Sequence, residues 1–312
     1  RIMNAEAEFL QGRFVDAQIC LENTYVHIAE NGQENMVLCC DFLALRLALC
    51  TELSLSYTIA ERRKELLRRH NITWVTLFDS VCAYYYALSG QITQIPVLFR
   101  EHQLSTVNFL APGKPMMELI ENQVYLAQQE YAKVIGRSEG LLAVCEAMHY
   151  ALVALHVQIQ TAAAYECLGK RTEARNCLKR ALQIALPDQF YLPFVENYEY
   201  LEELLQREIQ TADAAEHVFL TKVTELGKNC QKRYGALRKT HMFPKIAAEL
   251  TEQEQRIIEL LAERLSNREI AEKLFLSEGT IKQYINRIYA KLQISGDVRT
   301  KRRQLIELLT AE

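Results

Sequence analysis

Three polar side chains near the C-terminus, Lys282, Gln283 and Asn286, have types and a spacing that suit the edges of nucleic-acid bases. A lysine ammonium can donate to the acceptors of guanine, and the side-chain amides of glutamine and asparagine can pair bidentately with adenine. A helix turns by about 100° per residue, so these three positions fall on adjacent rows of one face. They therefore predict a helix that reads duplex DNA in the major groove.

Neighbouring side chains suit the phosphate backbone of the same duplex. The helix start at Ser266 and Asn267 leaves backbone N–H groups available for a phosphate oxygen. The side chains expected to contact phosphates are Asn267, Arg268, Thr280 and Arg287.

Capping signals place these residues on three short helices. Thr251 followed by Glu254, and Ser266 followed by Glu269, are capping boxes, and each marks a helix start. Ser277 is expected to cap a third helix. The predicted helices span about 252–263, 267–274 and 278–292, with a tight turn at 275–277 before the third.

The opposite sides of these helices are apolar at helical spacing. The side chains expected to be buried are Ile257, Ile258 and Leu261 on the first helix, Ile270, Ala271 and Leu274 on the second, and Ile281, Ile285, Ile288 and Leu292 on the third. A solvated face of a small helical domain is the alternative interpretation. Two capping boxes, a tight turn and this apolar spacing together favour a DNA reader.

The stretch 250–294 resembles the LuxR-type, or GerE-type, helix-turn-helix domain. The matching elements are Leu250-Thr251, Glu254, Leu261-Ala262, Ser266-Asn267-Arg268-Glu269-Ile270-Ala271, Leu274, Leu276-Ser277, Thr280-Ile281-Lys282, Ile288-Tyr289 and Lys291-Leu292. In that family the third helix enters the major groove, and a fourth helix pairs two domains on a two-fold site. The resemblance therefore implies a homodimer on DNA and a fourth helix at about 298–310.

Three features depart from the family pattern. Arg264 stands where the family usually has Gly, Tyr284 replaces a common His, and the loop 294–299 is longer before its Arg than usual. Because Lys301-Arg302-Arg303 follows, we expect the fourth helix to touch the DNA backbone as well as its partner. The complete set of expected DNA contacts is Asn267, Arg268, Ser277, Thr280, Lys282, Gln283, Tyr284, Asn286 and Arg287.

The long N-terminal part reads as pairs of helices. In residues 162–182 a helix ends at Leu168, Gly169 turns the chain, and a second helix starts near Thr172. The small residues expected to let these two helices approach closely are Ala163, Ala174 and Ala181. Further turns are expected at 12, about 53, 90 and 136, at the spacing of tetratricopeptide-like (TPR-like) α-solenoids. We therefore expect a curved array with a concave inner surface.

Helical repeats, a bend at 192–196 and a LuxR-type domain together resemble the large MalT-like regulators, which carry an upstream ATP-binding domain. This chain has no phosphate-binding loop, so we expect no cofactor in it. The resemblance implies either that this chain is the C-terminal part of such a regulator, with an ATP-binding domain upstream of Arg1, or that it is a shorter relative without that domain. We predict an all-α fold, with a TPR-like sensor and interaction domain at 1–234, a linker at 235–248 and a four-helix LuxR-type domain at 249–312.

The composition agrees with an all-α cytoplasmic protein, and the resemblance to LuxR-type regulators implies a bacterial one. The 312 residues are 49% apolar and include only 6 Pro and 11 Gly, and no apolar run reaches the roughly 18–20 residues of a membrane span. The nine cysteines form no C-x-x-C pair and predict reduced core thiols. The net charge is −3, but residues 250–312 carry eleven Lys and Arg against ten Asp and Glu. Attraction to phosphate would therefore come from local patches.

Residues that could do other chemistry form no catalytic constellation, so we expect no enzyme. His149 and His156 are seven residues apart and could share a helix face, but they have no acidic partner at ligand spacing. We expect ordinary helix residues there and no metal site. The run Tyr84-Tyr85-Tyr86 predicts packing, with a ligand-stacking platform as the alternative. Trp74 and Phe78 are expected to make a core contact.

The leading hypothesis is a sequence-specific transcriptional regulator. A small-molecule or protein effector would act on the helical-repeat domain, and the C-terminal domain would bind promoter DNA as a homodimer, with RNA polymerase as a candidate partner. The alternative is a repeat-based protein-interaction scaffold with a vestigial DNA-binding domain. Steeply salt-sensitive binding of a duplex by residues 245–312 would separate these two hypotheses.

Overall fold

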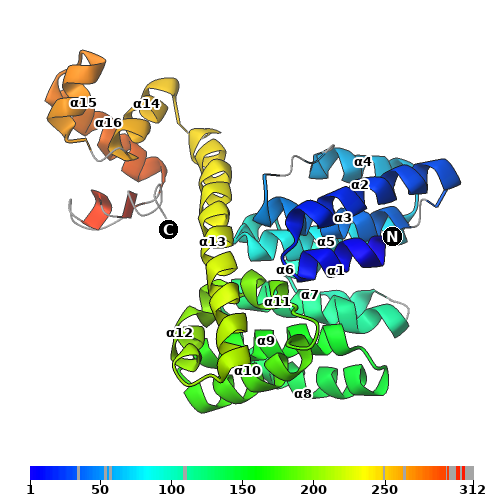
Figure 1. Ribbon diagram of the computed structural model, residues 1–312. Helices are drawn as coiled ribbons and strands as arrows, with labels where there is room; N and C mark the ends of the chain where they lie inside the picture. Colours follow the sequence, from blue (N-terminus) through cyan, green and yellow to red (C-terminus); the bar gives the residue numbers. More distant parts are fainter. Residues whose placement is uncertain are drawn as a thin grey trace. The chain divides into compact units, whose positions relative to one another are not determined.

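The computed structural model describes residues 1–33, 36–52, 55, 58–107, 111–248, 250–262, 265–292, 294, 300–302 and 304–305. Within this part of the chain the regular secondary structure is helical and contains no β-strand, so the predicted all-α class is confirmed (Figure 1). The chain divides into two compact units, residues 1–234 and 235–312.

The described helices range in length from 4 residues in α6 to 35 residues in α13. The α-helices are α1 (Ile2–Leu10), α2 (Phe14–Asn31), α3 (Val37–Cys50), α4 (Ile59–Arg68), α5 (Ile72–Leu88), α6 (Val97–Arg100), α7 (Lys114–Ala127), α8 (Tyr131–Ala147), α9 (Ala151–Cys167), α10 (Arg171–Ala185), α11 (Leu192–Glu196), α12 (Tyr198–Ile209), α13 (Ala214–Ala248), α14 (Glu252–Ala262), α15 (Asn267–Leu274) and α16 (Glu278–Lys291). In the first unit α1 packs on α2, α2 on α3, α7 on α8, α8 on α9 and α9 on α10. This succession of packed neighbours forms the TPR-like stack of helix pairs.

The hairpin of α9 and α10 shows how sequence sets this stack. Gly169 adopts the left-handed conformation at φ 72°, and its N–H donates to the carbonyl of Glu166 at 2.9 Å, which closes α9. Ala163, Ala174 and Ala181 are fully buried. Small side chains let the two backbones approach, so both the turn and the close packing predicted from the sequence are confirmed.

The turns predicted at Gly12 and Gly90 are also left-handed, with φ of 73° and 70°, but the turn predicted at Gly136 is wrong. Gly136 lies inside α8. The chain turns on either side of that helix, at Gln129 and His149, whose φ values are 63° and 56°. The sequence analysis expected a single turn at Gly136, but the two turns in this region are formed by the non-glycine residues Gln129 and His149.

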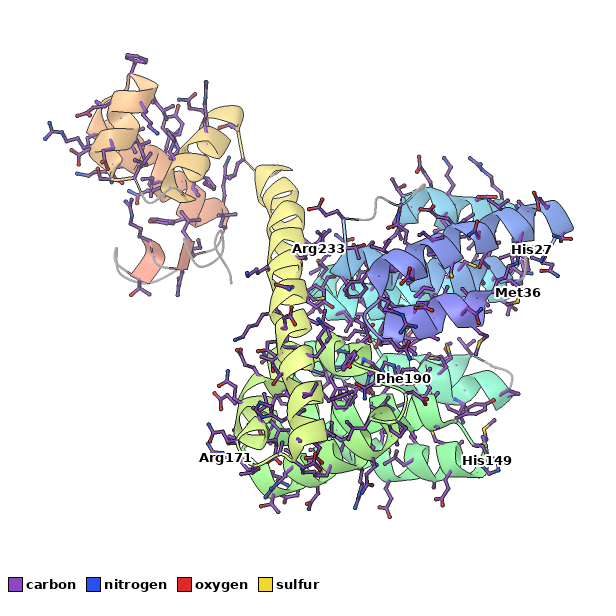
Figure 2. All side chains as sticks on the ribbon, viewed as in Figure 1. His27, Met36, His149, Arg171, Phe190 and Arg233 are labelled. Carbon is purple, nitrogen blue, oxygen red and sulfur yellow. The ribbon has the colours of Figure 1, made fainter. Side chains whose placement is uncertain are left out.

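His149 lies in the turn before α9 (Figure 2). His156 is buried within α9, so the two residues do not share a helix face as considered above. Burial, together with the charge of Arg46, lowers the pKa of His156 to about 3, and the imidazole is neutral at pH 7. Among the described residues no group of His, Cys, Asp and Glu could hold a metal ion.

The segment 192–197 packs against helices from most of the first unit. Phe194 and Val195 are fully buried, and α11 contacts α1 and α9. Gln123 on α7 donates to the side-chain oxygen of Asn197 at 3.0 Å, and Tyr191 N–H donates to the carbonyl of Leu10 at 2.8 Å. The segment therefore lies against several helices of the first unit, and the concave inner surface expected for the array stays a prediction.

A buried ionic cluster fixes this segment in place. Arg46 on α3 donates to Glu196 at 2.6 Å and to Glu6 at 2.5 Å, and Tyr84 on α5 donates to the other oxygen of Glu196 at 2.9 Å. Burial alone would lower the pKa of Arg46, but the charges of Glu196 and Glu6 raise it overall, so the guanidinium stays charged. Its charge and hydrogen bonds specify where the segment must lie.

The aromatic residues singled out in the sequence belong to the core. Tyr84 and Tyr85 are buried, and Tyr86 packs on the same small cluster as Phe78 and Trp74. The predicted packing role of these residues is therefore confirmed.

Helix α13 extends beyond residue 234, where the first domain was predicted to end. Its backbone stays helical through the predicted linker at 235–248. The role of that segment as a linker between domains stays a prediction. No helix in the described part of the chain is both long and apolar enough to cross a membrane.

Candidate nucleic-acid interface

The candidate DNA-reading side chains lie on α15 and α16, and α14 supports both helices. The start of α14 has the predicted capping box. The carboxylate of Glu254 accepts from Thr251 N–H at 2.8 Å and from its hydroxyl at 3.1 Å, and Glu254 N–H donates back to that hydroxyl at 3.4 Å. The first helix therefore begins where the sequence placed it.

The same local chemistry sets the starts of α15 and α16. Ser266 and Glu269 form the second capping box, with Ser266 N–H donating to the Glu269 carboxylate at 2.7 Å. These hydrogen bonds lower the pKa of Glu269. Ser277 caps α16 by accepting from Thr280 N–H at 3.0 Å. Both predicted caps are confirmed.

The tight turn between α15 and α16 centres on Phe275. Its backbone is left-handed, with φ 54°, and its side chain is 95% exposed. The next residue, Leu276, donates its N–H to the carbonyl of Ala271 at 2.9 Å and closes the end of α15. The turn fixes the angle at which α16 leaves α15.

The apolar faces of the three helices join in one core. Its buried members are Leu250, Ile257, Ile258, Leu261, Ile270, Ala271, Ile281, Ile285, Ile288, Tyr289, Ile294 and Leu305. The burial expected for Leu274 and Leu292 is wrong in degree, because both are only partly buried against this cluster. Each lies at the end of its helix, where fewer neighbours surround it.

The side of α16 opposite this core presents the predicted base-reading residues to solvent. Lys282, Gln283 and Asn286 are exposed, and Arg287 follows on the same side. The Lys282 ammonium lies 2.9 Å from Glu278, in a pair whose side chains are 61% and 49% exposed. Such an exposed pair contributes little to stability, so Lys282 can exchange Glu278 for another acceptor at little cost.

The predicted phosphate-contacting residues occupy the two helix starts and the far end of the exposed side. Arg268 is exposed and pairs with Glu272 at 3.1 Å. The Ser277 and Thr280 hydroxyls lie 2.8 Å apart. The Arg287 guanidinium lies 5.6 Å from the ring centre of Tyr284, which orients both side chains.

Arg302 has a structural role that the sequence analysis missed. Its guanidinium donates to the side-chain oxygen of Asn267 at 2.7 Å and to the carbonyl of Leu265 at 2.5 Å. Arg302 therefore holds both sides of the Ser266 cap, and it fixes the Asn267 amide with its oxygen turned toward the guanidinium. The sequence analysis expected this basic run to touch the DNA backbone, and the 35-residue separation from Asn267 left no local signal for the contact.

A second long-range pair joins α14 to α16. The Lys291 ammonium lies 2.6 Å from the Glu254 carboxylate, whose side chain is only 3% exposed. Burial by itself raises the pKa of Glu254, but the hydrogen bonds from Lys291 and Thr251 outweigh it and lower the pKa overall. The carboxylate that caps α14 thus also anchors the C-terminal end of α16.

Of the predicted fourth helix at 298–310, residues 300–302 and 304–305 are helical and Leu305 is buried. The rest of that helix, Arg264 and the loop residues 295–299 lie outside the described residues.

Sequence comparison relates this part of the chain to known proteins. Residues 248–302 match the family described as bacterial regulatory proteins of the luxR family. Over 43 residues the chain is 49% identical to the DNA-binding transcriptional activator DevR/DosR of Mycobacterium tuberculosis, a match that covers 14% of this chain and 20% of that relative. No solved structure matched the chain.

The C-terminal segment is therefore a helix-turn-helix domain of the class found in bacterial transcription regulators. More specifically, it is a LuxR-family domain, as its residues indicated. The chain spans about one fifth of the length of the relative it matches, so the likeness describes this domain and not the helical repeats.

Proposed function

We propose that this protein is a transcriptional regulator that binds promoter DNA through α16. The observation that carries the proposal is the exposed side of α16, where Lys282, Gln283 and Asn286 face solvent on a helix capped at its start and packed on a common core. One helix fits the major groove of B-form DNA, where these three side-chain types can pair with base edges. The presence of a similar domain in a DNA-binding transcriptional activator supports the proposal.

The phosphate contacts follow from the same placement. With α16 in the major groove, the start of α15 points its Asn267 and Arg268 toward one flanking backbone, while Thr280, Tyr284 and Arg287 border the groove. The side-chain oxygen of Asn267 accepts from Arg302, so the amide N–H groups of Asn267 would be the donors to a phosphate. Pre-set side chains lose less conformational freedom on binding, which favours affinity.

The electrostatic contribution should be modest for a DNA-binding protein, because the domain is nearly neutral. Two arginines, Arg268 and Arg287, are the charged members of the proposed phosphate set. Neutralising two phosphates per domain predicts a slope of about −2 in the logarithm of affinity against the logarithm of salt concentration. A homodimer would double that slope.

The finer features of this function are also proposals. The helical-repeat unit would receive a small-molecule or protein signal, and the chain would act in the cytoplasm as a MalT-like regulator, with an ATP-binding domain upstream of Arg1. Two copies would pair on DNA through the fourth helix, and RNA polymerase would be the protein partner at the promoter. The succession of helical repeats and a LuxR-family domain supports this organisation.

Duplex selection tests the DNA-reading role. The full chain would be used to enrich duplexes from a random pool, and affinity for the enriched duplex would be measured by gel shift at several salt concentrations. Lys282→Ala and Asn286→Ala should each weaken binding about 5- to 100-fold, the loss of one good base contact. Lys64→Ala, an exposed lysine on α4 in the first unit, is the matched control and should bind normally.

Two results would overturn the proposal. Unchanged binding by both α16 variants would remove this face from the DNA contact. The second result is that no duplex is enriched and that any remaining binding of DNA is independent of salt. The protein-interaction scaffold then explains the chain better, because contacts between proteins need not neutralise phosphates.

A further inference from the structure

Helix α2 (Phe14–Asn31) carries apolar side chains on two opposite sides. Its inner side packs on α1 and α3, and its outer side has a second aliphatic stripe, formed by Val15, Ile19 and Val26. We propose that this outer stripe is a docking surface for a basic amphipathic helix of a partner protein. Docking itself does not depend on the DNA-reading role, whereas any regulatory effect of the partner rests on the proposed function.

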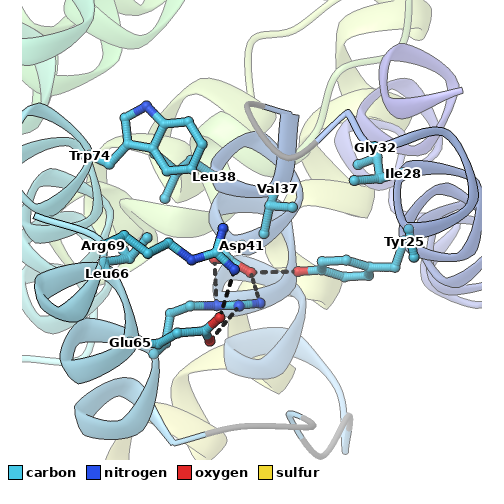
Figure 3. A pocket seen from close by; sticks show the side chains of 12 residues that line it. Tyr25, Ile28, Gly32, Val37, Leu38, Asp41, Glu65, Leu66, Arg69 and Trp74 are labelled. Atoms are coloured by element: carbon cyan, nitrogen blue, oxygen red, sulfur yellow. Dashed lines mark hydrogen bonds and ion pairs between the residues drawn. The ribbon is translucent and has the colours of Figure 1, made fainter. Parts of the chain in front are cut away.

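The inner side of α2 holds the helix in the first unit. Four residues at the spacing of one helix face are buried there, namely Ala17, Leu21, Thr24 and Ile28. In Figure 3 Tyr25 points from α2 toward Asp41 on α3, and its hydroxyl donates to that carboxylate at 2.8 Å. These contacts fix the rotation of α2 about its own axis, so the opposite side faces away from the core.

The outer stripe lies roughly opposite these buried residues, because a helix turns by about 100° per residue. Val15, Ile19 and Val26 are 71%, 52% and 57% exposed. A surface helix normally has a polar outer side, and the fully exposed residues of α10 in the same unit are indeed all polar. Branched side chains also lose rotamer freedom in a helix, so they do not favour an unpacked helix face. The stripe therefore indicates a further contact.

The spacing of the stripe suits another helix. Steps of four, three, four and three residues connect five exposed positions, which are Val15, Ile19, Glu22, Val26 and Ala29. This is the heptad seam along which two helices pack side by side. The seam extends for about 21 Å at a rise of about 1.5 Å per residue, so it matches a partner helix of about four turns.

The charge of α2 is of one sign. The helix contains Asp16, Glu22 and Glu30 and has no lysine or arginine. Glu22 lies within the seam and Glu30 beside it, both are exposed, and neither forms an ion pair with any residue that the structure describes. Arg13, just before the helix, already pairs with Glu8. Electrostatic complementarity therefore requires a partner that brings lysine or arginine toward Glu22 and Glu30.

The same carboxylates disfavour other occupants of this face. A second copy of α2 would place carboxylates opposite carboxylates, and such like-charge contacts weaken an interface. Phosphates of DNA and anionic lipid headgroups would be repelled for the same reason. A basic amphipathic helix satisfies both features, because its apolar side covers the seam while its cations meet the carboxylates.

The probe is a fluorescein-labelled peptide of about 20 residues, since shorter isolated helices are marginal in water. It has isoleucine and leucine at the heptad seam and lysine at the flanking positions. A second peptide with glutamate in place of each lysine is the control. Anisotropy titrations with the full chain should show saturable binding of the lysine peptide, about ten-fold weaker binding of the glutamate peptide, and loss of this difference at high salt.

Matched variants assign the binding to α2. Ile19→Ser should weaken binding of the lysine peptide about ten-fold, and Glu22→Gln about three-fold, with a smaller difference between the two peptides. Val218→Ser changes a valine on α13 that is 66% exposed, and Glu139→Gln neutralises an exposed carboxylate on α8. Both of these controls should bind like the unmodified chain. Far-UV circular dichroism would show that all four variants are folded.

Three results of the titrations would overturn the proposal. They are no saturable binding of the lysine peptide up to about 100 μM, equal binding of the two peptides at low salt, and equal loss of affinity in Ile19→Ser and Val218→Ser. Sedimentation velocity tests the remaining alternative. A dimer of the unmodified chain that Ile19→Ser dissociates would assign this face to a second copy and would also overturn the proposal.

Gel shifts with and without the lysine peptide then test the regulatory consequence. Peptide binding through α2 by a chain that fails to bind DNA would support the docking surface and refute the proposed function. Normal DNA binding by a chain that does not bind the peptide would refute the docking surface alone.

Discussion

Replacing Lys291 by methionine should destabilise the C-terminal domain by about 2 kcal/mol. The change removes an ammonium 2.6 Å from the Glu254 carboxylate, whose side chain is 3% exposed. Removing one partner of a fully buried pair costs about 3–5 kcal/mol, and a hydrogen bond to a charged group contributes about 1.5–3 kcal/mol. The expected cost lies toward the lower of these values, because Lys291 is 37% exposed and Thr251 keeps its contacts with the carboxylate.

Hydrogen exchange measured by mass spectrometry is the suitable assay, since it reports each unit of the chain separately. A loss of about 2 kcal/mol should lower protection in α14 and α16 about thirty-fold, and peptides from α9 should be unaffected. Lys282→Met is the matched control on α16. Its pair with Glu278 is exposed, so that change should cost less than about 0.5 kcal/mol. Equal losses in the two variants would refute the reasoning, and so would unchanged protection in the Lys291 variant.

The pH dependence of this effect has a defined sign. Folding lowers the pKa of Glu254 from 4.5, because the hydrogen bonds from Lys291 and Thr251 outweigh burial. The stability from this group is therefore present above about pH 4.5 and is lost as pH falls through the lower folded pKa. Without Lys291, burial is less opposed and the folded pKa rises. The difference in free energy of unfolding between the unmodified chain and the Lys291 variant should be largest at pH 7 and should decrease at acidic pH.

Three further changes test other contacts. Gly227→Ala would bring a Cβ within 2.4 Å of the Tyr198 ring, so the free energy of unfolding of the first unit should fall by about 1–3 kcal/mol in urea titrations followed by tryptophan fluorescence. Gly136→Ala, at an open position inside α8, should instead raise it by about 0.5–1 kcal/mol, and a loss there would contradict the helix assignment. Arg302→Gln should weaken binding of the enriched duplex about ten-fold by releasing Asn267, with partial recovery in Arg302→Lys; normal affinity in Arg302→Gln would exclude the positioning role.

The sequence predicted best those features that depend on neighbours three or four residues away. The caps at Thr251, Ser266 and Ser277 are of this kind, and each helix of the DNA-reading domain begins where its cap indicated. The turns of the repeat unit were harder, because Gln129 and His149 adopt a left-handed backbone that glycine usually takes. At such a turn the closing hydrogen bonds offset the steric cost of a left-handed backbone. The residue type therefore does not indicate that a turn is present.

Contacts between distant residues could not be predicted. The Arg302 contact with Asn267 spans 35 residues and the Lys291 contact with Glu254 spans 37, so both depend on how the helices pack and not on any local pattern. The exposed face of α16 was predicted from the helical spacing of its apolar residues, the Ser277 cap and the resemblance to the LuxR-type domain. Its role in contacting DNA stays a prediction that the duplex assay tests.

The ionic cluster around Arg46 has a consequence for synthesis on the ribosome. Glu196 lies 150 residues after Arg46 and 112 residues after Tyr84. It therefore emerges from the exit tunnel long after the first helix pairs. A nascent chain that stops short of residue 196 holds a guanidinium with one of its two carboxylates missing, in surroundings that will later exclude water. The early repeats should therefore remain loosely packed during translation, and they should tighten only when the stretch around Glu196 arrives.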